Sequence, residues 1–229
     1  MMNQDGVHLG VGAQGFSKQY WDENYYDLSL MEFTFNARQH AVALRELFSL
    51  EDIHVNTMID FGFGLGHLLR EMTIAFQPFI VVGVEPSEYP FQVVKDEAVL
   101  DNLANADVHL FQTDMHSWLH KEHPPLEAPL DLGICSGVFQ YLSDDEIASV
   151  VPQLAHWVKY LYFTVDTDLL YQYQEEELDY VDRFATQRSQ QQYYEMITPY
   201  FTAVSSRLLE SKTYFNTQNT QFKELFFRF

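Results

Sequence analysis

The chain has 229 residues, of which 47% are hydrophobic, and its 13 Lys and Arg stand against 33 Asp and Glu, a formal net charge of −20. The length predicts one domain, with an added lobe left open, and the apolar content suffices for a packed core and excludes a disordered chain. The negative charge argues against a general nucleic-acid-binding surface and against binding to anionic membranes, because both are contacted through Lys and Arg.

Three features of the sequence concern its compartment. The one cysteine, Cys135, cannot form an internal disulfide, which is typical of a reducing environment. The first residues do not carry the basic and apolar segments of a secretory signal, and no window reaches the roughly 20 apolar residues of a membrane span. We therefore expect a soluble, cytoplasmic protein.

The first part of the chain predicts a helix, a strand and a second helix. After Asn36, apolar residues from Ala37 to Phe48 recur at helical spacing. Thr57–Asp60 is a short apolar strand that runs into a cluster of glycines. A strongly amphipathic helix follows, with one apolar face made of Leu65, Leu68, Leu69, Met72 and Phe76.

The alternation of apolar strand and amphipathic helix then repeats. The further strands expected are Phe79–Val84, Val108–Gln112, Leu130–Cys135 and Tyr160–Val165. One helix between them is Tyr89–Leu103. Another begins after Ser143, which forms a capping-box pattern with Glu146.

The last part of the chain departs from this alternation. Asp166–Gln192 is polar and rich in acids. Beyond it, the pattern predicts a helix at Tyr193–Phe201. Two strands, Val204–Phe215 and Phe222–Phe229, are then expected on either side of the polar connector Asn216–Gln221.

Short strands that are apolar throughout, each followed by an amphipathic helix, indicate a parallel sheet covered on both faces. Right-handed crossovers turn this order into an open, doubly wound α/β fold, whose ligands bind beyond the carboxyl ends of the strands. Polar or glycine residues stand at those ends, at Asp60 with Gly62, Glu85, Asp114 and Ser136. We therefore expect the binding site at this edge.

The most informative motif lies within Met58–Met72. Here a strand ends, and Gly62, Gly64 and Gly66 precede a helix, an arrangement that permits a tight turn and close approach of a ligand to the backbone. A dinucleotide-binding loop would have its third glycine where His67 stands, and a P-loop would have Gly-Lys-Ser/Thr. The pattern therefore favours neither a pyrophosphate nor a triphosphate.

Acids follow the later strands as well. Glu85, after the second strand, could accept hydrogen bonds from a ribose diol, and Asp114, after the third, could accept from an exocyclic amine. Either acid alone is equally well explained as a solvated turn residue or a helix N-cap. One acid at each of three successive strand ends, counting Asp60, favours a nucleotide-binding site.

With these motifs in order, the sequence resembles the class I S-adenosylmethionine-dependent methyltransferases. Residues 60–66 (DFGFGLG) resemble motif I of that family, and residues 84–87 (VEPS) and 112–114 (QTD) resemble the acidic ends of its second and third strands. Residues 130–147 and 159–166 resemble its fourth strand with the following helix, and its fifth strand.

The resemblance implies a Rossmann-like, doubly wound sheet of seven strands, mostly parallel with an antiparallel last strand. It implies an N-terminal helical cap at residues 1–50, a cofactor-binding methyltransferase domain at residues 51–229, and a lid inserted at residues 169–194. The implied cofactor is S-adenosylmethionine, which leaves as S-adenosylhomocysteine.

By the same resemblance, four groups of residues would bind the four parts of the cofactor. The methionine part is expected at Asp60, Gly62, Gly64 and Gly66, and the ribose at Glu85, Pro86 and Ser87. The adenine is expected at Asp114 and Met115, and the sulfonium above Ser136, Gly137 and Val138.

Methyl transfer from a sulfonium depends mainly on alignment and exclusion of water, so the sequence need not contain a catalytic triad. A general base is needed only where the acceptor is protonated. The candidates for that base are His67, His156 and Tyr25.

Two other kinds of reactive residue are interpreted as structural. Cys135 lies within an apolar strand and is interpreted as a core residue. His116, His120 and His123 have no cysteine partner and fit a surface helix, so no metal site is predicted.

The acceptor is expected among the segments outside the sheet. Aromatic residues precede the core at Tyr20, Trp21, Tyr25, Tyr26, Phe33 and Phe35, and Leu169–Tyr194 interrupts it later. Such rings suit a planar or apolar small molecule, or they simply fill the edge of the core. The acids from Glu175 to Asp182 would attract a cationic acceptor or form a solvated helix face.

Three functions follow from these observations. The first is methyl transfer from S-adenosylmethionine to an O or N acceptor on a small molecule, without a nucleic-acid or membrane partner and with a homodimer left open. The second is a protein methyltransferase for a basic target, which the net charge of −20 favours. The third is a non-catalytic interaction protein of the same fold, which the bulky Phe61 and Phe63 of the loop keep open.

Overall fold

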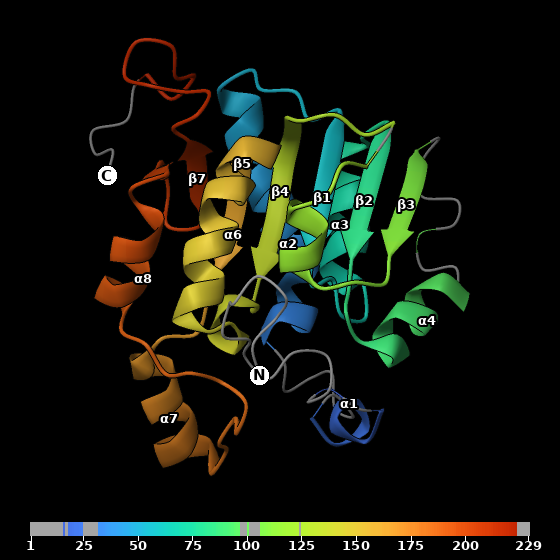
Figure 1. Cartoon of the computed structure of the whole chain (residues 1–229), viewed down its shortest axis with the longest axis vertical. Helices are drawn as coiled ribbons and strands as arrows, with labels where there is room; N and C mark the ends of the chain where they lie inside the picture. Colours follow the sequence, from blue (N-terminus) through green and yellow to red (C-terminus); the bar gives the residue numbers. More distant parts are fainter. Residues whose placement is uncertain are drawn as a thin grey trace.

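The computed structural model describes residue 16 and residues 18–24, 32–96, 100, 106–123 and 125–223. Its centre is a seven-stranded sheet (Figure 1). The strands are β1 (Thr57–Phe61), β2 (Ile80–Val84), β3 (Asp107–Phe111), β4 (Leu130–Ser136), β5 (Val158–Thr164), β6 (Phe201–Ala203) and β7 (Leu208–Ser211).

The strand order is β3-β2-β1-β4-β5-β7-β6. β1 to β5 run parallel, and β7 runs antiparallel to both β5 and β6. The order reverses direction at β1 and β4, which places a switch point between their carboxyl ends. The predicted Rossmann-like, doubly wound sheet with an antiparallel last strand is therefore confirmed.

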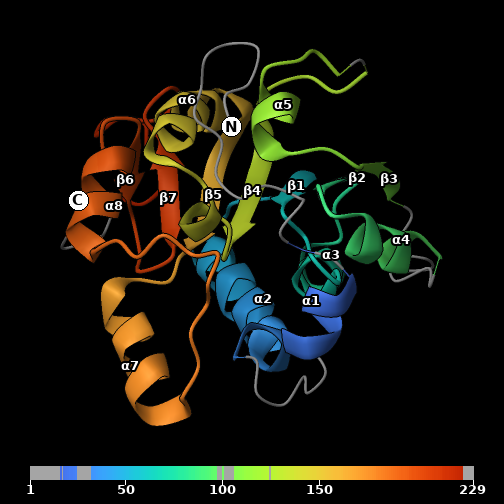
Figure 2. The ribbon, with the colours of Figure 1, turned by 60° about the horizontal axis from the view of Figure 1, so that its bottom comes forward.

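Helices cover both faces of the sheet (Figure 1). One face carries α2 (Glu32–Leu50), α3 (His67–Phe76) and α4 (Glu88–Asp96), and the other carries α5 (Met115–Leu119), α6 (Asp144–Trp157) and α8 (Gln190–Ile197). Two further helices, α1 (Lys18–Asn24) and α7 (Asp168–Leu178), lie at the edge where the parallel strands end (Figure 2).

Strand β1 shows why its sequence is apolar throughout. Met58 is fully buried in the cluster that includes Phe48 of α2 and Leu69 of α3. Ile59 is fully buried in the opposite cluster, together with Trp118 of α5. Because successive side chains point to opposite faces, a central strand of a covered sheet must be hydrophobic on both.

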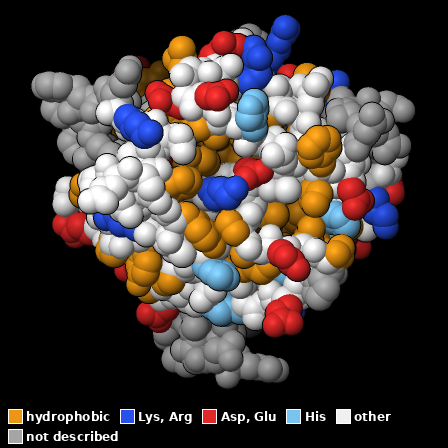
Figure 3. Space-filling model, turned by 90° about the horizontal axis from the view of Figure 1, so that it is seen from above, with side chains coloured by type: hydrophobic (Ala, Val, Ile, Leu, Met, Phe, Trp, Pro, Cys, Tyr) orange, Lys and Arg blue, Asp and Glu red, His pale blue; other side chains and the backbone are white. Residues whose placement is uncertain are grey.

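The opposite edge, where the parallel strands begin, is held together by Asp131 of β4. Its carboxylate accepts hydrogen bonds from the backbone N–H of Asn56 at 2.9 Å and of Thr57 at 3.1 Å. It also pairs with the ammonium of Lys159 on β5 at 2.6 Å. This edge is seen face-on in Figure 3, where apolar side chains lie between scattered charges. Asp131 therefore joins the starts of β1, β4 and β5.

The final strand pair agrees only in part with the prediction: β7 lies within the predicted strand Val204–Phe215, but the strand that pairs with it at the sheet edge is β6, which precedes it. The pair is β6 and β7, and its turn is Ser205–Arg207, where the Ser205 hydroxyl accepts from the N–H of Leu208 at 3.1 Å. Phe215 and Phe222 are not strand residues; their rings pack on Tyr160 at centroid distances of 4.9 and 6.1 Å. Residues 224–229 lie outside the described residues.

Two predicted helices have different ends. α8 ends at Ile197, and Phe201 begins β6, so the helix predicted at Tyr193–Phe201 starts earlier and stops sooner. α4 ends at Asp96, and part of the helix predicted at Tyr89–Leu103 lies outside the described residues. Within the described ranges, no helix has the length and apolarity that a membrane crossing requires.

The domain division at residue 50 stays a prediction. α2 shares one buried cluster with β1, β2 and β4 through Ala41, Leu44 and Phe48. It is therefore a packing layer of the sheet as well as part of the N-terminal segment. The lid proposed for residues 169–194 is built from α7, a connecting loop and the first half of α8.

Candidate functional site

The glycine loop between β1 and α3 takes a conformation that suits glycine. Gly62, Gly64 and Gly66 have φ angles of +76°, +53° and +78°, which L side chains rarely adopt. A Cβ atom at Gly62 would lie 2.6 Å from Cγ2 of Val138. The loop is therefore pressed against the segment that follows β4, and a side chain at Gly62 has no room.

Glu85 at the end of β2 is bonded to this loop. One of its carboxylate oxygens accepts from the N–H of Gly64 at 3.0 Å, and the other accepts from the N–H of Ser87 at 2.8 Å. The residue is buried, and burial raises the pKa of its carboxyl while these hydrogen bonds oppose the rise. Each oxygen keeps a further lone pair, so the carboxylate can also accept from a diol.

Asp60, near the end of β1, is the second buried acid of the site. Its exposed fraction is 2%. Burial, and then the charge of Glu85, raises the pKa of the Asp60 carboxyl well above its usual range. Ionisation of a buried carboxylate is costly unless a cation pairs with it, so Asp60 is suited to receive a cationic group of a ligand.

Asp114 follows β3 and caps a helix. It is exposed, and its carboxylate accepts from the N–H of Ser117 at 2.7 Å, so it is the N-cap of α5. The next residue, Met115, is buried. The N-cap interpretation therefore holds for Asp114, and it leaves the second carboxylate oxygen available at the same edge of the sheet.

The residues after β4 lie directly beside the glycine loop. Ser136 and Thr164 share a hydrogen bond between their hydroxyls at 2.7 Å, and the N–H of Gly137 donates to the Thr164 carbonyl at 3.0 Å. Val138 then closes on Gly62. The fold thus brings Asp60, the glycines, Glu85 and residues 136–138 to the switch point between β1 and β4.

The three candidate bases are not gathered at one place. His67 is the first residue of α3 and half-buried, and its pKa is lowered by burial and then by Arg70. His156 is exposed near the end of α6, next to the start of β5, because α6 runs back toward the opposite edge. It does not lie with the glycine loop. Tyr25 lies outside the described residues.

Aromatic side chains of α1 lie over the loop. A Cβ atom at Gly64 would be 3.3 Å from the ring of Trp21, which is buried. The neighbouring Tyr20 meets the ring of Phe16 at a centroid distance of 5.0 Å, and Phe16 meets Tyr141 at 4.8 Å. Of the six aromatic residues that the sequence singled out, only Tyr20 and Trp21 have described side chains.

Sequence reasoning missed three members of this aromatic cluster, of which Phe16 precedes α1. Tyr141 stands in the 3-10 helix after β4 (Phe139–Tyr141), and Phe184 stands in the loop after α7, 5.7 Å from Phe16 between centroids. Both are brought to α1 by contacts between distant segments. The one local feature of the sequence that could have indicated their place in the cluster is that both residues are aromatic.

Phe61 and Phe63 do not fill the loop. Phe61 is fully buried and packs edge-on against Trp118 at 5.6 Å, on one face of the sheet. Phe63 lies on the other face, 6.2 Å from Phe91. Their size is explained by core packing, which removes the feature that favoured a non-catalytic protein.

The histidines of the α5 region each have a local partner. His116 shares a hydrogen bond with Ser149, His120 bonds to the His116 carbonyl, and His123 bonds to the Trp118 carbonyl. The ring of His123 also stacks on Trp118 at 4.2 Å. These contacts fit the structural interpretation of the three histidines.

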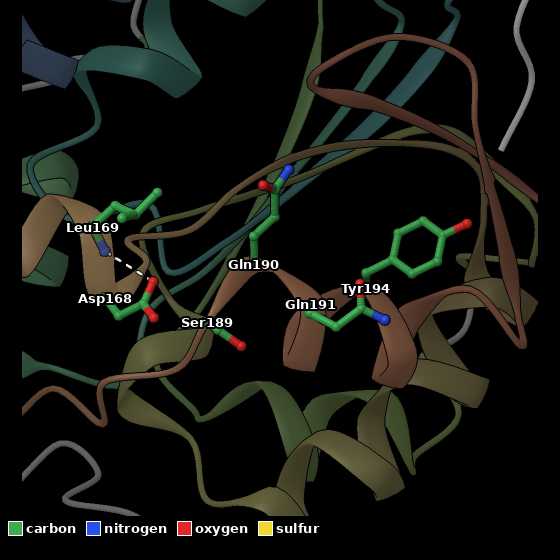
Figure 4. Close-up of a pocket in the computed structure, with 6 residues that line it drawn as sticks. All are labelled: Asp168, Leu169, Ser189, Gln190, Gln191 and Tyr194. Atoms are coloured by element: carbon green, nitrogen blue, oxygen red, sulfur yellow. Dashed lines mark hydrogen bonds between the residues drawn. The ribbon is translucent and has the colours of Figure 1, made fainter.

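A cavity of about 520 Å³ opens where α7 and α8 begin (Figure 4). It combines exposed apolar side chains with hydroxyl, amide and carboxylate groups. Its lining residues are Asp168, Leu169, Ser189, Gln190, Gln191 and Tyr194. All but Asp168 lie within the predicted lid at 169–194, and none was a predicted site residue.

Comparison with known proteins identifies the fold. No family model matches the sequence, and the search of curated proteins gave no significant match. Solved structures do match, at identities that establish the fold alone. They include magnesium protoporphyrin IX methyltransferase from Synechocystis PCC 6803, solved with S-adenosylhomocysteine, with TM-score 0.54, 17% identity, and 85% of this chain and 96% of that chain covered.

Two further structures agree with this result. The plantazolicin methyltransferase BpumL, in complex with S-adenosylhomocysteine, matches with TM-score 0.60 and 14% identity over 82% of this chain and 72% of that chain. An S-adenosylmethionine-dependent methyltransferase from Clostridium acetobutylicum ATCC 824 matches with TM-score 0.58 and 9% identity over 84% of this chain and 96% of that chain. The chain therefore has the fold of the class I S-adenosylmethionine-dependent methyltransferases.

Proposed function

We propose that this protein is an S-adenosylmethionine-dependent methyltransferase that transfers a methyl group to an oxygen or nitrogen atom of a small molecule. The observation that carries the proposal is the contact between Glu85 and Gly64. It joins the acid after β2 to the glycine loop after β1. A buried carboxylate at the switch point of a doubly wound sheet is suited to hold a ribose.

The residues at the switch point fit the cofactor. Gly62 and Gly64 supply the positive φ angles that the tight turn after β1 requires, with Val138 packed on Gly62 and Trp21 on Gly64. Asp60 supplies a buried carboxylate for an ammonium group, and Glu85 supplies two oxygens for the ribose hydroxyls. Asp114 and Met115 stand after β3, where the adenine is expected.

When bound, the cofactor supplies a methyl group on a sulfonium, which is a good leaving group. The chain's part in such a reaction is to align the acceptor and to exclude water. Ser136, Gly137 and Val138 form a rigid wall beside the glycine loop, because Thr164 holds the first two. Trp21 covers the loop from the α1 side.

His67 is the candidate that receives the acceptor's proton. It directly follows the glycine loop, and its lowered pKa keeps the imidazole neutral at physiological pH, the form that accepts a proton. His156 is not proposed for this role, because it lies at the opposite edge of the sheet.

Two observations support a small-molecule acceptor. The aromatic cluster of Phe16, Tyr20, Trp21, Tyr141 and Phe184 offers flat apolar surfaces beside the loop. The names of two proteins of similar structure give magnesium protoporphyrin IX and plantazolicin as what they methylate.

A basic polypeptide is the second candidate acceptor. Glu175, Glu176 and Glu177 are exposed on α7, at the same edge of the sheet as the glycine loop. Such a surface attracts cationic groups. Salt-sensitive binding of a basic peptide, followed by its methylation, would favour this candidate over a small molecule.

The proposed compartment is the cytoplasm. Cys135 is a free thiol that is fully buried in the core of the sheet. A fold that needs no disulfide is compatible with a reducing compartment. The homodimer stays a prediction.

Calorimetry with S-adenosylhomocysteine tests the proposed function. We expect binding to the wild type, and weakening by at least about tenfold in Glu85→Ala, because a hydrogen bond to a charged group is lost. Glu88→Ala is the matched control, since Glu88 is an exposed acid three residues further along. Absence of binding heat with the folded wild type would contradict the proposal.

The transfer itself is measured with tritium-labelled methyl groups. S-adenosylmethionine that carries the label is incubated with the protein and with a cell extract freed of macromolecules. Label in an organic product, present with the wild type and lost with Gly64→Arg, is the expected result. Label only in added polypeptides would favour the second candidate.

A further inference from the structure

Arg188 is a buried arginine in the segment that leads into α8. Its side chain is 3% exposed, and its guanidinium donates to the Leu142 carbonyl at 2.8 Å and to the Phe139 carbonyl at 3.3 Å. The Nε atom donates to the Asp144 carboxylate at 2.8 Å. All of these acceptors belong to one short segment, Phe139–Asp144, which follows β4.

Other contacts join the insertion, which is the predicted lid at residues 169–194, to the same segment. The N–H of Thr186 donates to the Gln140 carbonyl at 2.7 Å, and the Tyr141 hydroxyl donates to the Asp182 carboxylate at 2.7 Å. The Arg188 carbonyl accepts from the N–H of Asp168 at 2.9 Å, which ties the start of α7 to the start of α8. Arg188 thus takes part in two sets of contacts: its side chain binds Phe139–Asp144, and its carbonyl joins the start of α7 to the start of α8.

The fastened segment reaches the glycine loop directly. Val138, one residue before Phe139, fills the space over Gly62. The Gln140 side chain folds back, and its Nε2 atom lies 3.6 Å from the position of a Cβ at Gly137. A displacement of Phe139–Leu142 therefore moves the wall against which the loop is packed.

We propose that Arg188 is a positioning residue for the cofactor site: it holds Phe139–Leu142 in place, and so keeps Val138 closed on Gly62. This inference rests on the proposed function, because it assigns Arg188 to the same site. Arg188 acts through the segment after β4 and is distant in sequence from every motif of the site. Through Arg188, the position of the insertion is also coupled to the conformation of the glycine loop.

The chemistry of the contacts explains why an arginine stands here. A planar guanidinium donates in several fixed directions, so it can hold two carbonyls and a carboxylate at once. Asp144 is 71% exposed, and solvent screens its attraction for the cation. The bonds to the two backbone carbonyls are therefore the ones expected to set the position of the segment.

Four variants test the inference, with S-adenosylhomocysteine as the probe. Arg188→Met removes every donor, Arg188→Lys keeps one cationic donor, and Asp144→Asn keeps the carbonyl bonds. Arg183→Met is the matched control, because Arg183 is an exposed arginine of the same insertion. The dissociation constant is measured by calorimetry well below each melting temperature, so that loss of stability alone does not change it.

We expect the dissociation constant to rise about tenfold in Arg188→Met, a size usual for residues that act through a neighbour. Arg188→Lys should fall between this variant and the wild type, and Asp144→Asn should stay within about threefold. Arg183→Met should leave it unchanged. Hydrogen exchange of the amides of residues 137–142 should accelerate in Arg188→Met at the same temperature.

The outcomes separate this inference from the proposed function. If the wild type does not bind the probe, both fail. If the wild type binds, and Arg188→Met binds equally well, the inference alone fails. Should Arg188→Met not fold, Arg188→Lys decides: affinity equal to the wild type would make Arg188 a stabilising residue only, and a weakened affinity in the folded variant supports positioning.

Discussion

The side chain of Val138 occupies the place where a side chain at Gly62 would have to lie. The distance from Val138 Cγ2 to the position of a Cβ at Gly62 is 2.6 Å, and Gly62 has a φ of +76°. Two parts of the chain, the loop after β1 and the segment after β4, thus fix each other. Neither can be altered without a change in the other.

Gly62→Ala is expected to destabilise the protein by about 2 kcal/mol, from the left-handed backbone and from overpacking against Val138. Binding of S-adenosylhomocysteine should weaken with it. Urea unfolding measures the first effect. The double variant Gly62→Ala with Val138→Ala should recover part of the loss, since only the clash is relieved. Strict additivity of the two substitutions would contradict the contact.

Asp60→Asn is expected to make the ligand-free protein more stable at neutral pH. The folded state raises the pKa of the Asp60 carboxyl, so it holds the proton more tightly than the unfolded chain does. The stability that this group contributes is therefore complete below about pH 4 and is lost as the pH rises toward the folded pKa. The variant should lose less stability as the pH rises.

Urea unfolding between about pH 5 and pH 8 measures this difference. Asp52→Asn is the control, because Asp52 is an exposed acid at a turn. Parallel pH dependence in the wild type and in Asp60→Asn would show that Asp60 does not carry the effect. The same variant should bind S-adenosylhomocysteine more weakly, because an amide cannot ionise to pair with the ammonium group of the ligand.

Trp21→Phe is expected to abolish the change in tryptophan fluorescence that accompanies binding of S-adenosylhomocysteine. Trp21 lies over Gly64, whereas Trp118 and Trp157 pack together in the core, 4.8 Å apart between centroids. Only Trp21 is placed to respond to a ligand at the glycine loop. A titration that shows the same change in Trp21→Phe would place the ligand elsewhere.

Ser143→Ala is expected to reduce the unfolding free energy by about 1 kcal/mol. The Ser143 hydroxyl accepts from the N–H of Glu146, and the Glu146 carboxylate accepts from the N–H of Ser143, which together cap the start of α6. Thermal or urea unfolding measures the loss. Ser206→Ala, at an exposed turn position, should change stability little.

The sequence predicted the central elements because their signals are local. The four inner parallel strands, β1, β2, β4 and β5, are mostly apolar in the chain itself, since both of their faces are covered. The capping box of α6 depends on two residues three positions apart, and it is present in the structure. The glycines and the acids after β1 and β2 stand at strand ends, and parallel pairing brings those ends together.

The features that were missed depend on distant contacts. The final strands are only three and four residues long, and the aromatic pattern that predicted longer ones comes from Phe215 and Phe222, which pack on Tyr160. Arg188 stands in a polar segment, and nothing in its neighbours shows that it is buried. Its role follows only from carbonyls some 46 to 49 residues earlier in the chain.

Asp131 gives the sheet an anchor at the edge far from all of these loops. Through Asn56, Thr57 and Lys159 it ties three neighbouring strands close to their starts. A slip of one residue would turn every buried side chain to the wrong face, and this carboxylate resists such a slip. Strand alignment is therefore secured at the edge remote from the glycine loop, by contacts in which neither α1 nor residues 169–194 take part.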